Sequence, residues 1–290
     1  MSFETLAEGL LFPEGPIAMP DGSVILVEIA RGTLSRCWNG KTEVVCDLGG
    51  GPNGAALGPD GAVYVANNGG GGVGGHRGLP AVQGGIDRVD LATGKAERLY
   101  DTVGGNPLSA PNDIVFDRQG GFWFTDFGRT FERTRARSGV YYAKPDGSYA
   151  EEISYGGTGY NGIGLSPDET VVYAAETWTG RLIAFDLEAP GKVVKGARRG
   201  RMVGAAPGRA FFDSLAVQSN GDVCVASIAD GITTMSPQGA VTQTPLPDNM
   251  VTNICFGGAD LMDAYITMSG VGSLIRMRWP QPGLKLNFSA

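Results

Sequence analysis

The stretch Asn161–Glu176, which reads NGIGLSPDETVVYAAE, contains the pattern that decides the fold. A polar residue opens it, and a short run of small and apolar residues follows. A Pro-Asp turn then reverses the chain into a strand rich in Val, Tyr and Ala. Turn residues between two such runs predict a β-hairpin.

The same pattern recurs along the chain, and such a repeat determines how each local segment is interpreted. A third strand follows each hairpin, and a stretch able to form a fourth strand follows most of them. The copies open at six polar residues: Glu14, Asn53, Asn112, Asn161, Asp213 and Asn253.

Repeats of three or four strands are typical of propellers, solenoids or sandwich pairs. The last copy ends near Trp279, whereas Phe3–Gly9 precedes the first copy with no strand to pair with. We expect this segment to complete the sixth unit, as propellers do to hide sheet edges. The prediction is an all-β, six-bladed β-propeller of four-stranded blades, forming a single domain over residues 1–290.

Composition agrees with this fold and excludes several functions. The 290 residues include 47 Gly and 17 Pro, which favours short strands and tight turns with little helix. A net charge of −7 disfavours binding to nucleic acid or an anionic membrane. No stretch has the apolar length of a membrane span or the layout of a signal peptide, so we expect a cytoplasmic protein.

The six opening residues point to a metal on the propeller axis. The first strand of each blade lines the central channel, so these residues should meet at one mouth. Asn and Asp also cap turns, which would explain any single copy. Six oxygen-bearing side chains in six copies favour a divalent cation such as Ca²⁺, Mg²⁺ or Mn²⁺, and Zn²⁺ or Fe²⁺ stays open.

The second strands return to the same mouth, so their last residues should form a wider ring around the axis. Asp126 and Glu176 are its most interesting members, because carboxylates near a metal can act as general bases or bind substrate hydroxyls. The alternative is that both are solvated turn residues. The predicted ring is Glu28, Asn67, Asp126, Glu176, Ser227 and Met268.

A Gly-rich connection, Asn67–Gly85, overhangs this mouth and contains His76, the only histidine. It is either a lid over the pocket or an ordinary surface loop. A Ser-His-Asp hydrolase would depend on His76, and no G-x-S-x-G motif is present. We retain His76 as a substrate-binding candidate. The four cysteines lack C-x-x-C spacing and are expected to be free thiols.

Four motifs together resemble a known family. EGP from Glu14, PND followed by WFTD, NGIGLSPD from Asn161 and DSLAV from Asp213 occur in the order seen in the gluconolactonase and regucalcin (senescence marker protein) family of six-bladed propeller lactonases. The resemblance spans nearly the whole chain. Each motif is short, so its specificity comes from the set.

The resemblance implies a role for each matching residue. Glu14, Asn161 and Asp213 match the metal ligands, and Asp213 also matches the proposed general base. Asn112 matches a residue that contacts the substrate close to the metal, and Asp126 matches a further substrate-contacting carboxylate. The family's Arg-Pro-Asn-Asp motif begins here with Ala110, which removes an anchor for sugar hydroxyls.

The expected function is a metal-dependent lactonase, a carboxylic ester hydrolase, with Asp213 or Asp126 activating water. Other chemistry on the same propeller, such as arylesterase activity, and a binding propeller with a structural ion remain alternatives. The expected partner is a small-molecule substrate, and the expected state is a monomer or small homo-oligomer.

Overall fold

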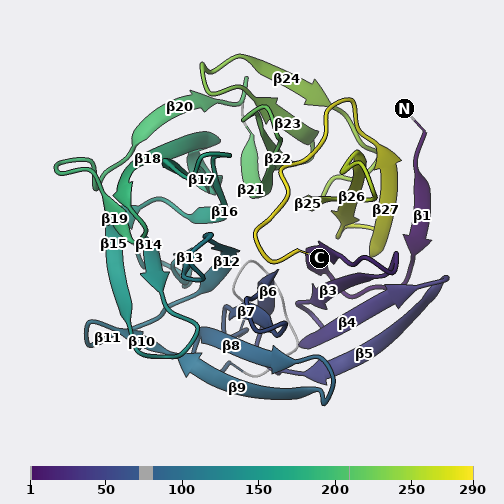
Figure 1. The fold of residues 1–290 in the computed structure, drawn as a ribbon, viewed down its shortest axis with the longest axis horizontal. Helices are drawn as coiled ribbons and strands as arrows, with labels where there is room; N and C mark the ends of the chain where they lie inside the picture. Colours follow the sequence, from purple (N-terminus) through teal and green to yellow (C-terminus); the bar gives the residue numbers. More distant parts are fainter. Residues whose placement is uncertain (1, 72–80, 209, 290) are drawn as a thin grey trace.

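The computed structural model describes residues 2–71, 81–208 and 210–289. Six blades surround a central axis, and within each blade the strands lie side by side in order from the axis to the rim (Figure 1). Neighbouring strands within a blade are antiparallel, and in the first five blades they follow chain order from the axis outward. The prediction of an all-β, six-bladed propeller is confirmed.

The first three blades follow each other without crossovers, and a small hairpin sits between the second and third. Blade 1 contains β2 (Pro13–Ala18), β3 (Val24–Glu28), β4 (Thr33–Trp38) and β5 (Lys41–Asp47). Blade 2 contains β6 (Pro52–Leu57), β7 (Val63–Asn67), β8 (Gly85–Asp90) and β9 (Lys95–Tyr100). The hairpin is β10 (Thr102–Val103) and β11 (Asn106–Pro107), and blade 3 contains β12 (Pro111–Phe116), β13 (Phe122–Asp126), β14 (Ser138–Ala143) and β15 (Ala150–Gly157).

The other three blades include the N-terminal strand. Blade 4 contains β16 (Tyr160–Leu165), β17 (Val171–Glu176), β18 (Arg181–Ala189) and β20 (Arg201–Ala205), with a short β19 (Lys192–Val193) beside β18 and a 3-10 turn η2 (Thr177–Thr179). Blade 5 contains β21 (Phe211–Val217), β22 (Val223–Ile228), β23 (Gly231–Met235) and β24 (Val241–Thr244). Blade 6 contains β25 (Val251–Gly257), β26 (Asp263–Met268), β27 (Ser273–Arg278) and β1 (Glu4–Ala7).

The N-terminal strand is the outer strand of the last blade. Glu4 and Thr5 of β1 pair with Arg276 and Ile275 of β27, and Arg276 also forms an ion pair of 2.6 Å with Glu4. The sheet therefore combines the two ends of the chain.

Turn chemistry explains the tight connections. Asn39 and Gly40 join β4 to β5 with φ angles of 51° and 71°. Positive φ at both central residues is the backbone of a type I′ turn, which Asn-Gly favours and which matches the twist of the flanking strands. The four cysteines are free thiols, as expected.

The core lies between blades as well as within them. Between blades 2 and 3, the ring of Tyr64 lies 5.0 Å from Phe116 and 5.8 Å from Phe122, measured between centroids. All three side chains are buried. Side chains from neighbouring sheets thus share one apolar layer, which holds the inner strands at a fixed distance from the axis.

One mouth of the ring is crossed by the C-terminal segment, shown in yellow in Figure 1. Asn287 donates hydrogen bonds to the Phe116 carbonyl at 3.1 Å and to Glu169 Oε1 at 2.7 Å. Phe288 meets Phe116 edge to face at 5.8 Å. A cavity of 170 Å³ lies under this segment. We call this end of the axis the far mouth.

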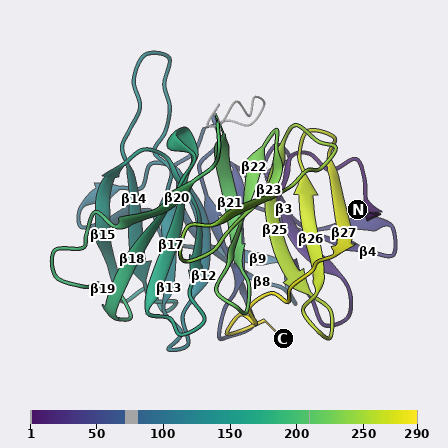
Figure 2. The same cartoon turned by 90° about the horizontal axis from the view of Figure 1, so that it is seen from above.

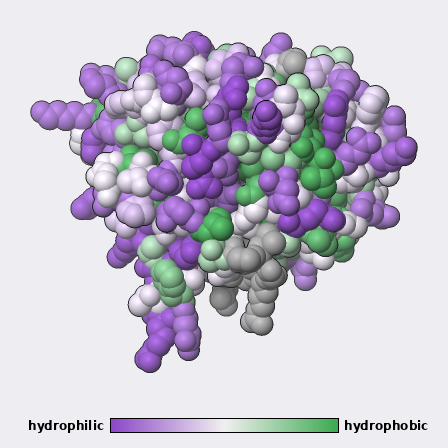
Figure 3. Space-filling view, turned by 90° about the horizontal axis from the view of Figure 1, so that it is seen from below, coloured by the Kyte–Doolittle hydropathy of each residue, from purple (hydrophilic) through white to green (hydrophobic). Residues whose placement is uncertain are grey.

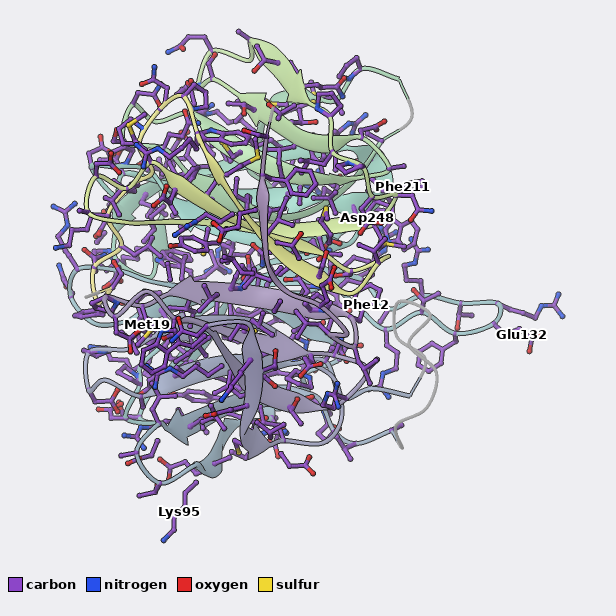
Figure 4. All side chains as sticks on the ribbon, turned by 90° about the vertical axis from the view of Figure 1, so that its right-hand side faces the viewer. Phe12, Met19, Lys95, Glu132, Phe211 and Asp248 are labelled. Carbon is purple, nitrogen blue, oxygen red and sulfur yellow. The ribbon has the colours of Figure 1, made fainter. Side chains whose placement is uncertain are left out.

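The opposite face carries a projecting loop, residues 127–137, between β13 and β14 (Figure 2). Phe131 N donates to Thr134 O, and Ala136 N donates to Arg129 O, so the loop folds as a hairpin. Its tip, marked by Glu132, points away from the body on the side where Phe12 and Phe211 lie (Figure 4). The surface at the tip is hydrophilic (Figure 3).

Within the described residues, no helix is long and apolar enough to span a membrane.

Candidate active site on the propeller axis

Each inner strand has an irregularity beside its polar opening residue. The pairing with the second strand shifts register after Glu14 in blade 1 and between Tyr160 and Ile163 around Asn161 in blade 4, and similar shifts occur in the other four blades. Such bulges turn a side chain out of the regular alternation of a strand. They direct the opening residues toward the axis.

Glycine next to two of these residues lets the inner strands converge. A Cβ on Gly15, whose φ is +53°, would lie 2.8 Å from backbone atoms of Asn53 and Ala55. A Cβ on Gly162 would lie 2.6 Å from the Leu215 nitrogen. Because real Cβ atoms do not approach backbone so closely, only glycine permits this packing around the axis.

Five of the six opening residues line one cavity of 170 Å³ at the mouth opposite the far mouth. We call it the axial cavity. Its polar floor consists of Glu14, Asn53, Asn112, Asn161 and Asp213. All are buried except Asp213, which is half-buried. The predicted convergence therefore exists in the structure.

The sixth opening residue, Asn253, lies behind Glu14 and supports it. Asn253 Nδ2 donates to Glu14 Oε2 at 2.7 Å, and the Gly15 backbone N–H donates to the same oxygen at 2.7 Å. The other oxygen, Oε1, is buried without a hydrogen-bond partner. Burial, followed by the negative charge of Asp213, raises the pKa of Glu14 well above its usual value.

The two central amides are oriented differently. Asn161 Nδ2 donates to Thr177 Oγ1 at 3.2 Å, and its Oδ1 accepts from Ser214 Oγ at 3.4 Å. Asn112 Oδ1 is buried and has no partner. Buried polar atoms are nearly always hydrogen-bonded, so an orphaned oxygen calls for an explanation.

Negative charge accumulates on the axis. Burial raises the pKa of Asp213 to about 7, and the charge of Asp113 adds to this, while the Asn161 side chain partly offsets it. Burial also raises the pKa of Asp113 to about 7. Asp113 accepts hydrogen bonds from the Ile114 and Ile163 backbone N–H groups at 2.9 and 3.0 Å. It lines the cavity at the far mouth rather than the axial cavity. Buried carboxylates of like charge are stabilised either by protonation or by a bound cation.

The floor of the axial cavity fits a hard divalent cation. Its donors are carboxylate and amide oxygens, and the orphaned Glu14 Oε1 and Asn112 Oδ1 are the ligand type that Ca²⁺, Mg²⁺ and Mn²⁺ prefer. No group of three or more His, Cys, Asp or Glu within the described residues could hold a metal ion. Any cation here depends on the amides as well as the two carboxylates.

The wider ring of the mouth is displaced by one residue from its predicted position. The predicted strand ends do not line the axial cavity, whereas in five blades the residue after each one does. Successive side chains of a strand point to opposite sides, so a shift of one residue reverses the direction. The residues that line it are Ile29, Asn68, Phe127, Thr177 and Ile228.

Asp126 and Glu176 are therefore not placed where a substrate in the axial cavity would meet them. Asp126 accepts backbone N–H groups of Ser109, Ala110 and Gly128 at 2.6 to 2.9 Å. Glu176 accepts the Thr158 N–H at 2.7 Å and the Thr179 hydroxyl at 2.5 Å. Both carboxylates hold loop backbone at blade corners and neither lines the axial cavity, whereas Asp126 lines a separate cavity beside Arg129 and Tyr141.

The remaining residues to place are His76 and the other wall residues of the axial cavity. His76 lies outside the described residues, as do residues 72–80 of the Gly-rich connection. The cavity wall also includes Phe12 and Met250, which sequence reasoning missed; each comes just before an inner strand, at the same level as the opening residues. Trp178 of η2 also lines the cavity.

Comparison with known proteins places the chain in a family. The model of the SMP-30/Gluconolactonase/LRE-like region matches residues 12–270. This chain belongs to that family. The matched region includes every residue of the axial floor, so the motifs that suggested the resemblance lie at the structural centre of the family's fold.

Curated members of the family are similar to the chain over different lengths. A gluconolactonase of Zymomonas mobilis is 25% identical over 285 residues, covering 88% of this chain and 75% of that protein. The lactonase drp35 of Staphylococcus aureus strain USA300 is 42% identical over 110 residues, covering 37% of this chain and 33% of that protein.

Solved structures share the fold along nearly the full length. A gluconolactonase from Xanthomonas campestris, XC5397, has a TM-score of 0.78 at 23% identity, covering 96% of this chain and 89% of that one. The calcium-binding protein regucalcin from Agrobacterium tumefaciens has a TM-score of 0.77 at 18% identity, covering 98% of each chain.

Proposed function

We propose that the chain hydrolyses the ester bond of a lactone in the axial cavity, with the help of one divalent cation. The observation that carries the proposal is the convergence of Glu14, Asn161 and Asp213 from three different blades beside the orphaned Asn112 oxygen. Membership of a family whose relatives are named gluconolactonase and lactonase supports the reaction class.

The proposed ligands are Glu14, Asn161 and Asp213, with Asn112 as a ligand or a substrate contact. When bound, the cation would act as a Lewis acid that polarises the lactone carbonyl. Asn253 and Gly15 keep one Glu14 oxygen occupied, which leaves the other free for the cation.

Asp213 is the proposed general base. Its half-buried carboxylate lines the cavity, so it can accept a proton from an attacking water molecule. The water oxygen bonds to the carbonyl carbon, the ring C–O bond breaks, and the proton passes to the departing alkoxide oxygen. The product is the open-chain hydroxy acid.

The experiment compares Asp213→Asn with Asp126→Asn in a lactone hydrolysis assay that follows acid release with a pH indicator. Loss of a general base should lower turnover by about 10²- to 10⁴-fold. Asp126→Asn should lower thermal stability, because it weakens the three hydrogen bonds from loop N–H groups, and should retain turnover. Full turnover by Asp213→Asn, with loss in Asp126→Asn, would reverse the assignment.

A further inference from the structure

The wall of the axial cavity above its polar floor is mostly apolar. No lysine or arginine of the described residues lines it, and its polar wall residues are Asn68 and Thr177. A sugar lactone carries hydroxyl groups that each need a hydrogen-bond partner on burial. The apolar and aromatic wall residues are Phe12, Ile29, Phe127, Trp178, Ile228 and Met250.

Trp178 is the largest of these side chains and stays 40% exposed. The turn η2 carries it, directly after β17. Gly159, with φ at +79°, lies against the indole: a Cβ there would be 2.5 Å from Trp178 Cδ1 and 3.2 Å from Phe127 Cε2. A side chain at Gly159 would push the indole out of place, so the observed position of Trp178 requires glycine here.

Aromatic neighbours hold the indole from two directions. Its ring centroid lies 5.8 Å from Phe127 and 5.9 Å from Phe211, the latter edge to face. Such aromatic pairs are stabilising beyond the area they bury. The cluster joins residues from blades 3, 4 and 5 around the cavity rim.

Arg135 fixes the ring from the projecting loop. Its guanidinium carbon lies 3.9 Å from the Trp178 ring centroid, and its Nε donates to Thr130 Oγ1 at 3.2 Å. No carboxylate of the described residues forms an ion pair with Arg135. The guanidinium therefore packs on the indole and restricts the Trp178 side chain. Because Trp178 is already held in place, it loses less conformational entropy when a ligand binds.

We propose that the lactone carries an apolar substituent, alkyl or aryl, which packs against Trp178 and Phe127 while the ring carbonyl lies at the polar floor. This inference rests on the proposed function and names its substrate class. A large aromatic side chain held rigid and partly exposed at a cavity rim is a surface for an apolar ligand group. Trp178 is then a specificity-determining residue.

The test uses three lactones with the same six-membered ring: δ-valerolactone without a substituent, δ-dodecalactone with an alkyl chain, and glucono-δ-lactone with hydroxyl groups. The wild type should favour δ-dodecalactone over the other two by about tenfold or more in kcat/KM. Trp178→Ala should remove most of this preference by raising KM for δ-dodecalactone, with little change for δ-valerolactone.

Trp38→Ala is the matched control. Trp38 is 51% exposed and also lies under an arginine, Arg36, at 5.7 Å, but it lines no part of the axial cavity. It should leave the preference intact. Preference for glucono-δ-lactone, or an equal loss on all three lactones in Trp178→Ala, would overturn the inference.

Binding measured without turnover separates this inference from the proposed reaction. Calorimetry with δ-valerolactam and its 6-alkyl derivative should show tighter binding of the alkyl lactam, and Trp178→Ala should abolish the difference. If that holds while no lactone is hydrolysed, the reaction is wrong and the apolar site stands. If lactones are hydrolysed without any alkyl preference in rate or binding, the reaction stands and the apolar site is wrong.

Discussion

Asn253 donates a hydrogen bond of 2.7 Å to Glu14 across 239 residues of sequence. It links the inner strand of the last blade to that of the first at the floor of the axial cavity. The bond occupies one Glu14 oxygen and leaves Oε1 unpartnered. A carboxylate held in this way presents a single oxygen to the axis.

Removing this support should weaken cation binding. In Asn253→Ala, Glu14 keeps only the Gly15 N–H and can rotate away from the axis, so affinity for the divalent cation should fall by about 10- to 100-fold. Calorimetric titration of the chelator-treated protein measures this. Asn220→Ala, which removes an exposed amide bonded to Asp222, is the control. Equal affinities in both variants would show that Asn253 does not position Glu14.

Stability of the cation-free protein should fall as pH rises. The folded pKa of Asp213 is about 7, above its ordinary 3.8. Such a group contributes stability that is present below its unfolded pKa and is lost as pH rises through its folded pKa. The melting temperature in chelator should therefore be lower at pH 8 than at pH 5.5. A divalent cation should raise it more at pH 8, because the ligands must be deprotonated.

Asp213→Asn provides the control for that measurement. The variant lacks the titrating carboxylate, so its melting temperature in chelator should depend less on pH. A wild-type protein that is equally stable at both pH values, with and without cation, would contradict the charge accumulation on the axis.

Gly159→Ala should displace Trp178. Alanine at positive φ costs about 1–3 kcal/mol of stability. Gly147→Ala is the matched control, because Gly147 has φ at +77° and nothing within 4 Å of the added Cβ. The larger loss in the free energy of unfolding for Gly159→Ala, measured by urea denaturation, reports the clash with the indole. Equal losses in the free energy of unfolding for the two variants would mean that the position of Trp178 does not depend on Gly159.

The far mouth should serve stability rather than catalysis. Phe288→Ala removes the contact with Phe116 and should cost about 1–3 kcal/mol, less than the ~3–5 kcal/mol of a fully buried Phe. Lactone turnover should not change, because the axial cavity, where we propose that the substrate binds, lies at the opposite mouth. Loss of turnover in a folded Phe288→Ala variant would place part of the site at the far mouth.

The sequence was sufficient for the blades and for the axial floor, because both follow from a repeated local pattern. Each opening residue precedes a turn that the chain itself encodes, so its place at one mouth could be inferred for Glu14 and Asp213 alike. The buried Asp113 was missed as an axial charge. Its neighbour Asn112 opens the same copy, and nothing in the local pattern shows that both lie near the axis.

The cavity wall was predicted one residue out of place because strand alternation amplifies a small error. Glu176 ends β17 and turns to the loop backbone, whereas Thr177 faces the cavity. Bulges and strand ends set that direction, and both depend on neighbouring blades. The Arg135 contact with Trp178 joins a loop of blade 3 to a turn of blade 4, which no local pattern predicts.

The most direct test is a cation titration of lactone turnover in the wild type and in Glu14→Gln, after removal of metal with a chelator. We predict that the chelated wild type loses turnover and regains it with one equivalent of divalent cation per chain. Glu14→Gln should need a much higher concentration, because it lacks one of the two carboxylate ligands. Turnover that survives complete removal of metal would contradict the axial cation.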